Sequence, residues 1–258
     1  MEPIYTAENV TPAYQLNWGL TLFWRQRPIP DDEWLKDIQA ATEPDGGRVL
    51  KHRFTTNNAS QVFVSTKPDV SPSEMIRSIK GRLQHFIRSQ EPRAFQRNYA
   101  VRSIGEATRS VVEDYVAKQT DHHPMADPRV QELLKQYQKS FPEVDLSLRV
   151  LSAHVMYWYG LHLVLVNEAR WMEIRAELLN SLSCMIERVA AKYECRLSRV
   201  GLLPDHIHLT LGCRIDQSPE SIALSLLNNC AYAVGMKPVF QSGYYVGTIG
   251  EYDRGAVA

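Results

Sequence analysis

The chain has 258 residues, of which 44% are hydrophobic and 22% are charged, a composition ordinary for a globular protein. Its 29 Lys and Arg residues balance its 29 Asp and Glu residues, so the net charge gives no indication of a polyanionic partner. The apolar run at residues 158–166 is too short to span a membrane.

The start of the chain and its cysteines indicate a cytoplasmic protein. The sequence opens with Glu2 and Pro3 rather than with a basic and apolar run, so we expect no secretory leader. The four cysteines all lie in the second half, and no two of them form a Cys-x-x-Cys motif. We therefore expect reduced thiols in a cytoplasmic protein.

Charge is unevenly distributed along the chain. Between Glu74 and Arg109 there are eight basic residues against three acidic ones. A basic segment in a neutral chain is compatible with a nucleic-acid groove, and it is equally compatible with the solvated face of a helix. Charge alone does not separate these two interpretations.

The first half of the chain is expected to alternate strands and helices. Residues 1–14 are expected to form a loose arm, and the Ser71-Pro72-Ser73-Glu74 segment has the composition of a helix start. The expected elements are a strand at 16–24, a helix at 31–41, strands at 48–55 and 61–66, a helix at 71–89, a strand at 99–104, helices at 106–118 and 127–140, and a linker at 141–151.

The second half repeats this order. The expected elements are a strand at 154–166, a helix at 171–193, strands at 195–202 and 206–213, a helix at 218–234 and a strand at 244–249. Residues 98–106 match residues 243–251 at an offset of 145, and both segments contain Ile-Gly-Glu. This internal repeat predicts an α+β fold in which helices cover one face of an antiparallel sheet, in two copies.

The two halves differ in complementary ways. His206 and His208 are two residues apart on a strand, so both imidazoles share one face and can hold one divalent metal ion. The first half carries Ala59-Ser60-Gln61 at about that position. Conversely, a helix with Tyr115 exists only in the first half, because an offset of 145 would place its counterpart beyond Ala258.

These motifs resemble those of the single-tyrosine HUH transposases of insertion sequences and of their relatives, the REP-associated tyrosine transposases. The resemblance covers about residues 16–253, in two copies. It is carried by the His-hydrophobic-His strand, the Ser-Pro helix start, a Gly-Tyr-x-Val-x-x-Ile-Gly strand and a helix with Tyr-Val-x-x-Gln-x-x-His-His. It implies two tandem ferredoxin-like (RRM-like) HUH domains at 1–125 and 151–258, joined by a linker helix and loop at 126–150, that form an intramolecular pseudo-dimer.

The resemblance also implies roles for particular residues. His206 and His208 match the metal ligands, Tyr115 matches the nucleophile, and Gln119, one helical turn later, matches the residue that completes the metal shell. In that family the tyrosine helix of one subunit serves the histidine pair of the other. One composite site in a fused chain would therefore need only the tyrosine of the first half and the histidines of the second.

The implied activity is that of a transposase-like nuclease and strand transferase. It would cut and rejoin single-stranded or hairpin DNA through a 5′-phosphotyrosine intermediate, with Mg²⁺ or Mn²⁺ as the cofactor. The chain would act as a monomeric pseudo-dimer in the bacterial cytoplasm, on the nucleoid when bound. The alternative is a domesticated, non-catalytic DNA-binding protein or regulator, since the first half has lost its histidine pair.

Other side chains have both a functional and a structural interpretation. Tyr115 by itself could be an ordinary tyrosine of an amphipathic helix, and His162 on its strand is expected to be structural. Asp205 could orient an imidazole or end a turn, and His122 and His123 could contact DNA or cap their helix. The basic residues expected along the DNA path are Arg77, Lys80, Arg82, Arg88 and Arg102.

Overall fold

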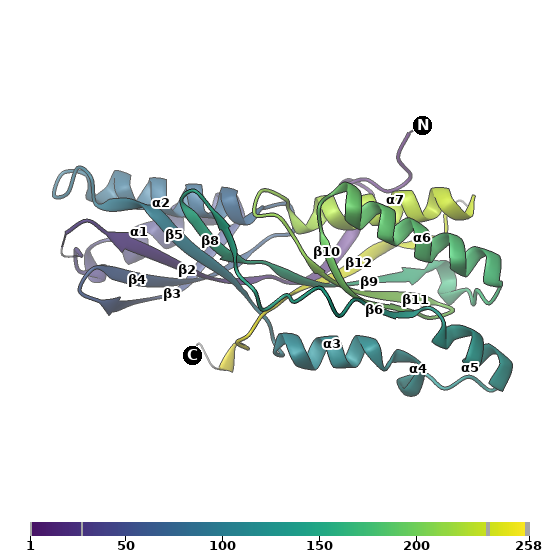
Figure 1. Cartoon of the computed structure of the whole chain (residues 1–258). Helices are drawn as coiled ribbons and strands as arrows, with labels where there is room; N and C mark the ends of the chain where they lie inside the picture. The colour runs from purple at the N-terminus through teal and green to yellow at the C-terminus, as the bar shows by residue number, and fades with distance from the viewer. Residues whose placement is uncertain (1, 27, 236–237, 256–258) are drawn as a thin grey trace.

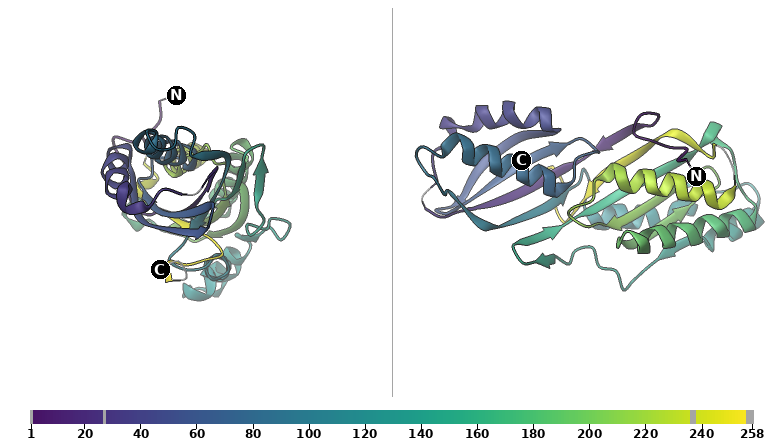
Figure 2. Two further views of the ribbon diagram at one scale, coloured as in Figure 1. Left: turned by 90° about the vertical axis from the view of Figure 1, so that its left-hand side faces the viewer. Right: turned by 90° about the horizontal axis from the view of Figure 1, so that it is seen from above.

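The protein has an α+β fold with two six-stranded sheets that lie side by side (Figure 1; Figure 2). The structure is a computed structural model that describes residues 2–26, 28–235 and 238–255. In this part of the chain, no helix is long and apolar enough to cross a membrane. The cytoplasmic location stays a prediction.

The first sheet has the strand order β3-β4-β2-β5-β8-β7. Its strands are β3 (Gly47–Thr56), β4 (Ala59–Thr66), β2 (Asn17–Trp24), β5 (Phe95–Ile104), β8 (Val155–Trp158) and β7 (Val150–Ser152). Helices α1 (Leu35–Thr42) and α2 (Pro72–Ile87) cover one face (Figure 1). The expected helix start is confirmed, because Ser71 and Glu74 form a reciprocal capping box at the N-terminus of α2.

The second sheet has the strand order β1-β12-β9-β11-β10-β6. Its strands are β1 (Thr11–Gln15), β12 (Phe240–Ile249), β9 (Gly160–Asn167), β11 (His206–Gly212), β10 (Arg196–Leu202) and β6 (Gln138–Ser140). Helices α6 (Ala176–Lys192) and α7 (Pro219–Val234) cover one face. Helices α3 (Arg109–Ala117), α4 (Gln119–His122) and α5 (Pro128–Lys135) lie along the opposite face (Figure 1).

The two halves exchange strands. β1 directly precedes β2 in the sequence, yet it pairs in parallel with β12 of the second half. In the same way β8 precedes β9 but pairs in parallel with β5 of the first half. Both sheets are therefore mixed rather than purely antiparallel. The expectation of a loose arm at residues 1–14 is wrong for residues 11–14, which form part of β1, and for Tyr5, whose buried hydroxyl donates to the Phe240 carbonyl (2.8 Å).

Several further element boundaries differ from the sequence-based expectation. The strands expected at 99–104 and 244–249 begin earlier, at Phe95 and Phe240. The helix expected at 127–140 ends at Lys135, and residues 138–140 form β6, which pairs with β10. The strand expected at 154–166 is divided at Tyr159, where the chain crosses from one sheet to the other. The helix expected from residue 171 begins only at Ala176.

The interface between the halves is reciprocal and buried. The Ser103 hydroxyl donates to the Ile249 carbonyl (2.5 Å) and accepts from the Gly160 amide (3.0 Å). At the equivalent place, the Thr248 hydroxyl donates to the Ile104 carbonyl (2.6 Å) and accepts from the Asn17 amide (2.9 Å). This pseudo-twofold set of hydrogen bonds holds the sheets at a fixed relative position.

Replacing the two hydroxyl groups tests this interface. Ser103→Ala and Thr248→Val each leave a buried amide without its acceptor, so each should lower the free energy of unfolding by about 1–3 kcal/mol. Denaturant unfolding monitored by circular dichroism measures the change. Ser181→Ala, which removes an exposed hydroxyl on α6, is the control and should stay within about 0.5 kcal/mol. Equal effects in all three variants would contradict a role of these hydroxyls in the interface.

Candidate active site

Helix α3 belongs to the first half by sequence but packs on the sheet of the second half. Two isolated bridges, Gly105 with Asp253 and Thr108 with Gly250, lead the chain from β5 towards the second half. The Arg109 amide then donates to the Gly250 carbonyl (2.6 Å) at the start of the helix. The chain therefore crosses the interface just before α3 begins.

A buried carboxylate fixes α3 on strand β10. Glu113 is only 5% exposed, and its carboxylate accepts a hydrogen bond from the Ser198 hydroxyl of β10. The Arg109 guanidinium lies 2.5 Å from the same carboxylate and 3.0 Å from that of Glu251. A buried charge that is paired and hydrogen-bonded in this way fixes the helix at one position along the strand.

Gly201 allows the helix to approach β10 closely. A Cβ at this position would lie 2.8 Å from Cγ of Gln119 and 3.0 Å from the carbonyl oxygen of Val116. Gly201 pairs with His208 on the neighbouring strand β11. Gln119 is therefore packed beside the strand position that carries His208.

The structure brings residues from both halves into one cluster of rings. The centroids of His206 and His208 on β11 are 5.0 Å apart. The ring of Tyr115 lies 5.5 Å from that of His208 and 5.3 Å from that of His122, and His123 lies 5.2 Å from His206. Tyr115 is 39% exposed, so part of this residue is accessible to solvent.

Each histidine of the pair uses Nδ1 for a hydrogen bond. Nδ1 of His206 lies 2.6 Å from Oδ1 of Asp205, whose other oxygen forms an ion pair with Arg170 (3.0 Å). Nδ1 of His208 lies 3.0 Å from Nε2 of His162 on β9. Nε2 is thus the nitrogen left on both members of the pair, which is the arrangement typical of histidine metal ligands.

His162 is the residue of this cluster to which the sequence interpretation assigned no role at the site. It lies on the strand next to β11 and pairs with Thr210, so its ring reaches His208 diagonally. β9 and β11 are neighbours in the sheet but are separated in the sequence by α6 and β10, so no local sequence pattern indicates this contact. Only the register of β9 against β11 could have identified it.

Burial keeps these imidazoles neutral. It lowers the pKa of His208 to about 2, with a further contribution from the neighbouring His162 and His206. Burial also lowers the pKa of His162 to about 4 and that of His206, where Asp205 acts in the opposite direction. The neutral imidazole is the form that ligates a metal ion.

Gln119 supplies a buried donor atom without a partner. Its side chain is fully buried, and its Nε2 donates to the Tyr115 carbonyl (2.9 Å). Its Oε1 has no hydrogen-bond partner in the structure, which is costly for a buried amide oxygen.

Among the described residues no three His, Cys, Asp or Glu side chains form a metal site. Two imidazoles with one amide oxygen can nevertheless hold a divalent cation, and this donor set suits Mn²⁺ at least as well as Mg²⁺, which prefers oxygen ligands.

The basic residues of α2 do not join this cluster. Helix α2 covers the face of the first sheet away from α3 (Figure 1). Nζ of Lys80 donates to the carbonyls of Gln96 (2.6 Å) and Arg97 (3.2 Å), and Arg82 is paired with Asp45 (2.7 Å). Arg77 on α2 and Arg88, which directly follows it, are both exposed. The role of all four residues in DNA binding stays a prediction.

Comparison with known proteins identifies the family. The family model described as "Transposase IS200 like" matches residues 38–119 and 155–257, which together are more than half of the chain. The chain belongs to the IS200-like transposase family. The match to two separate segments is what a fusion of two copies produces.

Two solved transposase structures match the chain at low sequence identity. A protein from Deinococcus radiodurans R1 assigned as a transposase is 17% identical, with a TM-score of 0.37 over 43% of this chain and 92% of the other. A REP-associated tyrosine transposase bound to a REP hairpin is also 17% identical, with a TM-score of 0.30 over 35% and 56% of the two chains. No curated protein matches the chain.

A methyl group at Gly201 tests the close packing of α3. Gly201→Ala should lower the free energy of unfolding by about 1–3 kcal/mol, because the new Cβ would overlap Gln119 and Val116. Gly81→Ala on α2 is the matched control. Nothing lies within 4 Å of its added Cβ, so it should raise the free energy of unfolding by about 0.5–1 kcal/mol. A neutral Gly201→Ala variant in chemical denaturation would contradict the contact.

Proposed function

We propose that this transposase cuts and rejoins single-stranded DNA through a covalent bond to Tyr115, at one composite site. The observation that supports the proposal is the contact of Tyr115, from the first half, with His208 of the second half. On strand β4 of the first half, Ala59 and Gln61 stand at the positions that His206 and His208 occupy on β11. Within the described residues 250–255, no helix follows β12. We accordingly propose that the limits 1–125 and 151–258 separate two parts of one functional unit.

The proposed reaction is a transesterification at a phosphodiester. The Tyr115 phenol loses its proton and its oxygen forms a bond to phosphorus, while the bond from phosphorus to the 3′ oxygen breaks. The departing 3′ oxygen takes up a proton, which leaves a 3′-hydroxyl on one strand end and a 5′-phosphotyrosine on the other. Because the bond energy is retained in the ester, the strand can be rejoined by the reverse reaction without ATP.

His206, His208 and Gln119 are the residues that would hold a divalent cation. When bound, Mg²⁺ or Mn²⁺ would polarise the scissile phosphate and stabilise the charge on the departing oxygen. Asp205 and His162 hold the two imidazoles so that Nε2 of each remains available. His122 lies next to Tyr115, and His123 lies next to His206. In this proposal both contact the DNA backbone.

A non-catalytic DNA-binding protein is the second candidate. Its support is the loss of one of the two histidine pairs, which leaves at most one site for DNA cleavage. A REP-hairpin complex of a relative supports DNA as the partner in both cases. The two candidates differ in one observable, which is the formation of a covalent protein–DNA adduct.

Removal of one oxygen atom tests the nucleophile. Tyr115→Phe should reduce adduct formation at least about 1,000-fold, because it removes the attacking oxygen and little else. The assay uses labelled single-stranded oligonucleotides from the flanks of the gene, with Mn²⁺ or EDTA, followed by denaturing electrophoresis. Tyr232→Phe, at a 63% exposed position on α7, is the control and should form the adduct as wild type does.

The remaining outcomes of this assay separate the alternatives. Binding of hairpin DNA by wild type without any adduct would favour the regulator. DNA cleavage that persists in Tyr115→Phe would mean that another group, or water, is the nucleophile.

Loss of His162 tests its role as a positioning residue for His208. In the ligating form of His208, Nδ1 carries the proton and donates to His162. His162→Ala should therefore weaken Mn²⁺ binding about 10- to 100-fold in titration calorimetry. His162→Gln, whose amide oxygen can accept the same proton, should recover part of this affinity. A folded His162→Ala variant with unchanged Mn²⁺ affinity would assign His162 a purely structural role.

A further inference from the structure

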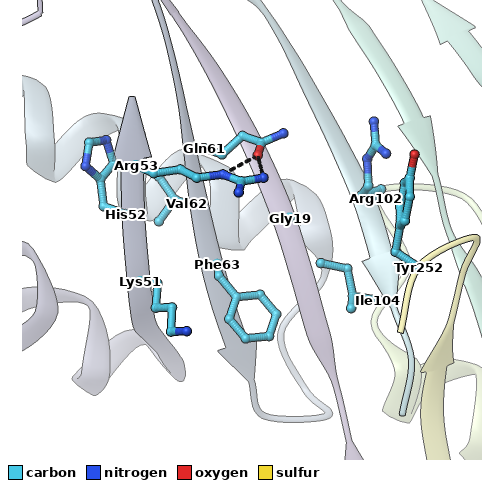
Figure 3. A pocket seen from close by; sticks show the side chains of 10 residues that line it. All are labelled: Gly19, Lys51, His52, Arg53, Gln61, Val62, Phe63, Arg102, Ile104 and Tyr252. Carbon is cyan, nitrogen blue, oxygen red and sulfur yellow. Dashed lines mark hydrogen bonds between the residues drawn. The ribbon is translucent and has the colours of Figure 1, made fainter. Parts of the chain in front are cut away.

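A cationic pocket lies on the first sheet, on the face that α1 and α2 leave uncovered (Figure 1; Figure 3). Its volume is about 360 Å³, which lies within the roughly 300–1,000 Å³ range of small-ligand sites. Strand residues Lys51, Arg53, Gln61, Phe63 and Arg102 line it, together with Tyr252 from the C-terminal segment.

The pocket occupies the position that the histidine cluster has in the second half. Strands β2, β4 and β5 pair in the same register as β9, β11 and β12, because the Asn17–Ile104 pair is equivalent to the Gly160–Ile249 pair. The equivalent positions that follow from this register are Gly19 for His162, Ala59 for His206 and Gln61 for His208. The three imidazoles are replaced there by small or amide side chains.

Helix coverage differs between the two faces as well. In the second half, α3 and α4 lie over the histidine face. The equivalent helix over the first sheet would have to follow β12, as α3 follows β5. Within the described residues 250–255, no such helix is present. The pocket is therefore open to solvent where its counterpart is covered.

The charge of the pocket is entirely positive. Lys51, Arg53 and Arg102 line it, and none of the residues around it is an Asp or a Glu. Within the described parts of the chain, none of these three cations forms an ion pair, in contrast to Arg82 on α2. Three unneutralised cations in one cavity are complementary to a phosphate backbone.

The cations are held in place by neutral neighbours. Nε and Nη2 of Arg53 donate to Oε1 of Gln61 (3.0 and 2.7 Å), as Figure 3 shows. The guanidinium of Arg102 lies between two aromatic rings, 4.9 Å from the Trp158 centroid and 5.3 Å from the Tyr252 centroid. Neither arrangement neutralises the charge, so both guanidinium groups remain available to an anion.

We propose that this former catalytic face binds a single-stranded DNA segment without cutting it. The proposal rests on the DNA strand transfer proposed above and adds a second contact region. Lys51, Arg53 and Arg102 bind phosphates of the segment, and the rings of the half-buried Phe63 and the exposed Tyr252 stack on its bases. The pocket ends at Ile104, four residues before the N-cap of α3, so it adjoins the segment that leads to Tyr115.

Salt dependence of DNA binding tests the phosphate contacts. The double variant Lys51→Gln/Arg53→Gln removes two exposed cations of β3, and it should reduce the slope of log Kobs against log salt by about 1.4. The probe is a fluorescein-labelled single-stranded oligothymidylate, measured by anisotropy in the Tyr115→Phe background so that no cleavage occurs. Lys36→Gln/Arg188→Gln, with the same loss of charge on exposed helix faces, is the control and should keep the wild-type slope.

Two further measurements locate the segment and its chemistry. Phe63→Ala should weaken binding roughly tenfold through loss of base stacking. Photocrosslinking with 5-iodouracil in the oligonucleotide should label peptides that contain Phe63 or Tyr252. Stronger competition by duplex DNA or by RNA than by single-stranded DNA would overturn the assignment of the occupant.

The outcomes separate this inference from the proposed function. If wild type forms the Tyr115 adduct while the pocket variant has the same salt slope as the control and the crosslinks map elsewhere, only the pocket proposal fails. If the pocket variant shows the reduced slope and crosslinks map to the pocket but no adduct forms, the pocket binds DNA and the catalytic proposal fails. If wild type binds no single-stranded DNA, both are overturned.

Discussion

The docking of α3 on β10 is the contact on which the candidate site depends. The buried Glu113 carboxylate accepts from Ser198, and Gly201 lets the helix lie close enough for Gln119 to be fully buried. Because α3 comes from the first half and β10 from the second, this packing only exists while the halves remain together. The exchanged strands β1 and β8 and the reciprocal hydroxyl hydrogen bonds fix that arrangement. Loss of the interface between the halves would therefore also separate the residues of the candidate site.

The two halves are related by pseudo-twofold symmetry at their interface, but the sheet faces that carry the histidine cluster and the cationic pocket differ. The interface contacts have counterparts on both sides of the axis, down to the bridges Gly105–Asp253 and Thr108–Gly250. The two open faces do not correspond. One carries three neutral imidazoles beneath the tyrosine helix. The other carries, in an open pocket, cations that form no ion pair with any residue that the structure describes. Duplication followed by divergence of one face accounts for this difference, because each face is free to change once the other retains the chemistry.

The sequence predicted the repeat, most helices and strands, and the residues that meet at the site, because these leave local signals. The capped start of α2 and the His-x-His strand are examples. It did not predict the exchange of β1, because parallel pairing between Thr11 and Gly243 leaves no pattern in either segment. It assigned no site role to His162, because that contact depends on the register of two strands. It gave Arg82 as a DNA-binding candidate, but composition does not reveal that Asp45, far away in sequence, is its partner.

A mixing experiment tests the composite site most directly. Tyr115→Phe protein, which keeps the histidine pair, is combined with His206→Ala/His208→Ala protein, which keeps the tyrosine, and adduct formation is measured with Mn²⁺ and single-stranded DNA. A site formed within one chain predicts that wild type forms the adduct and that the mixture forms none at any protein concentration. Adduct formation by the mixture that rises with concentration would contradict the account, because it would require the tyrosine of one chain to act with the histidines of another.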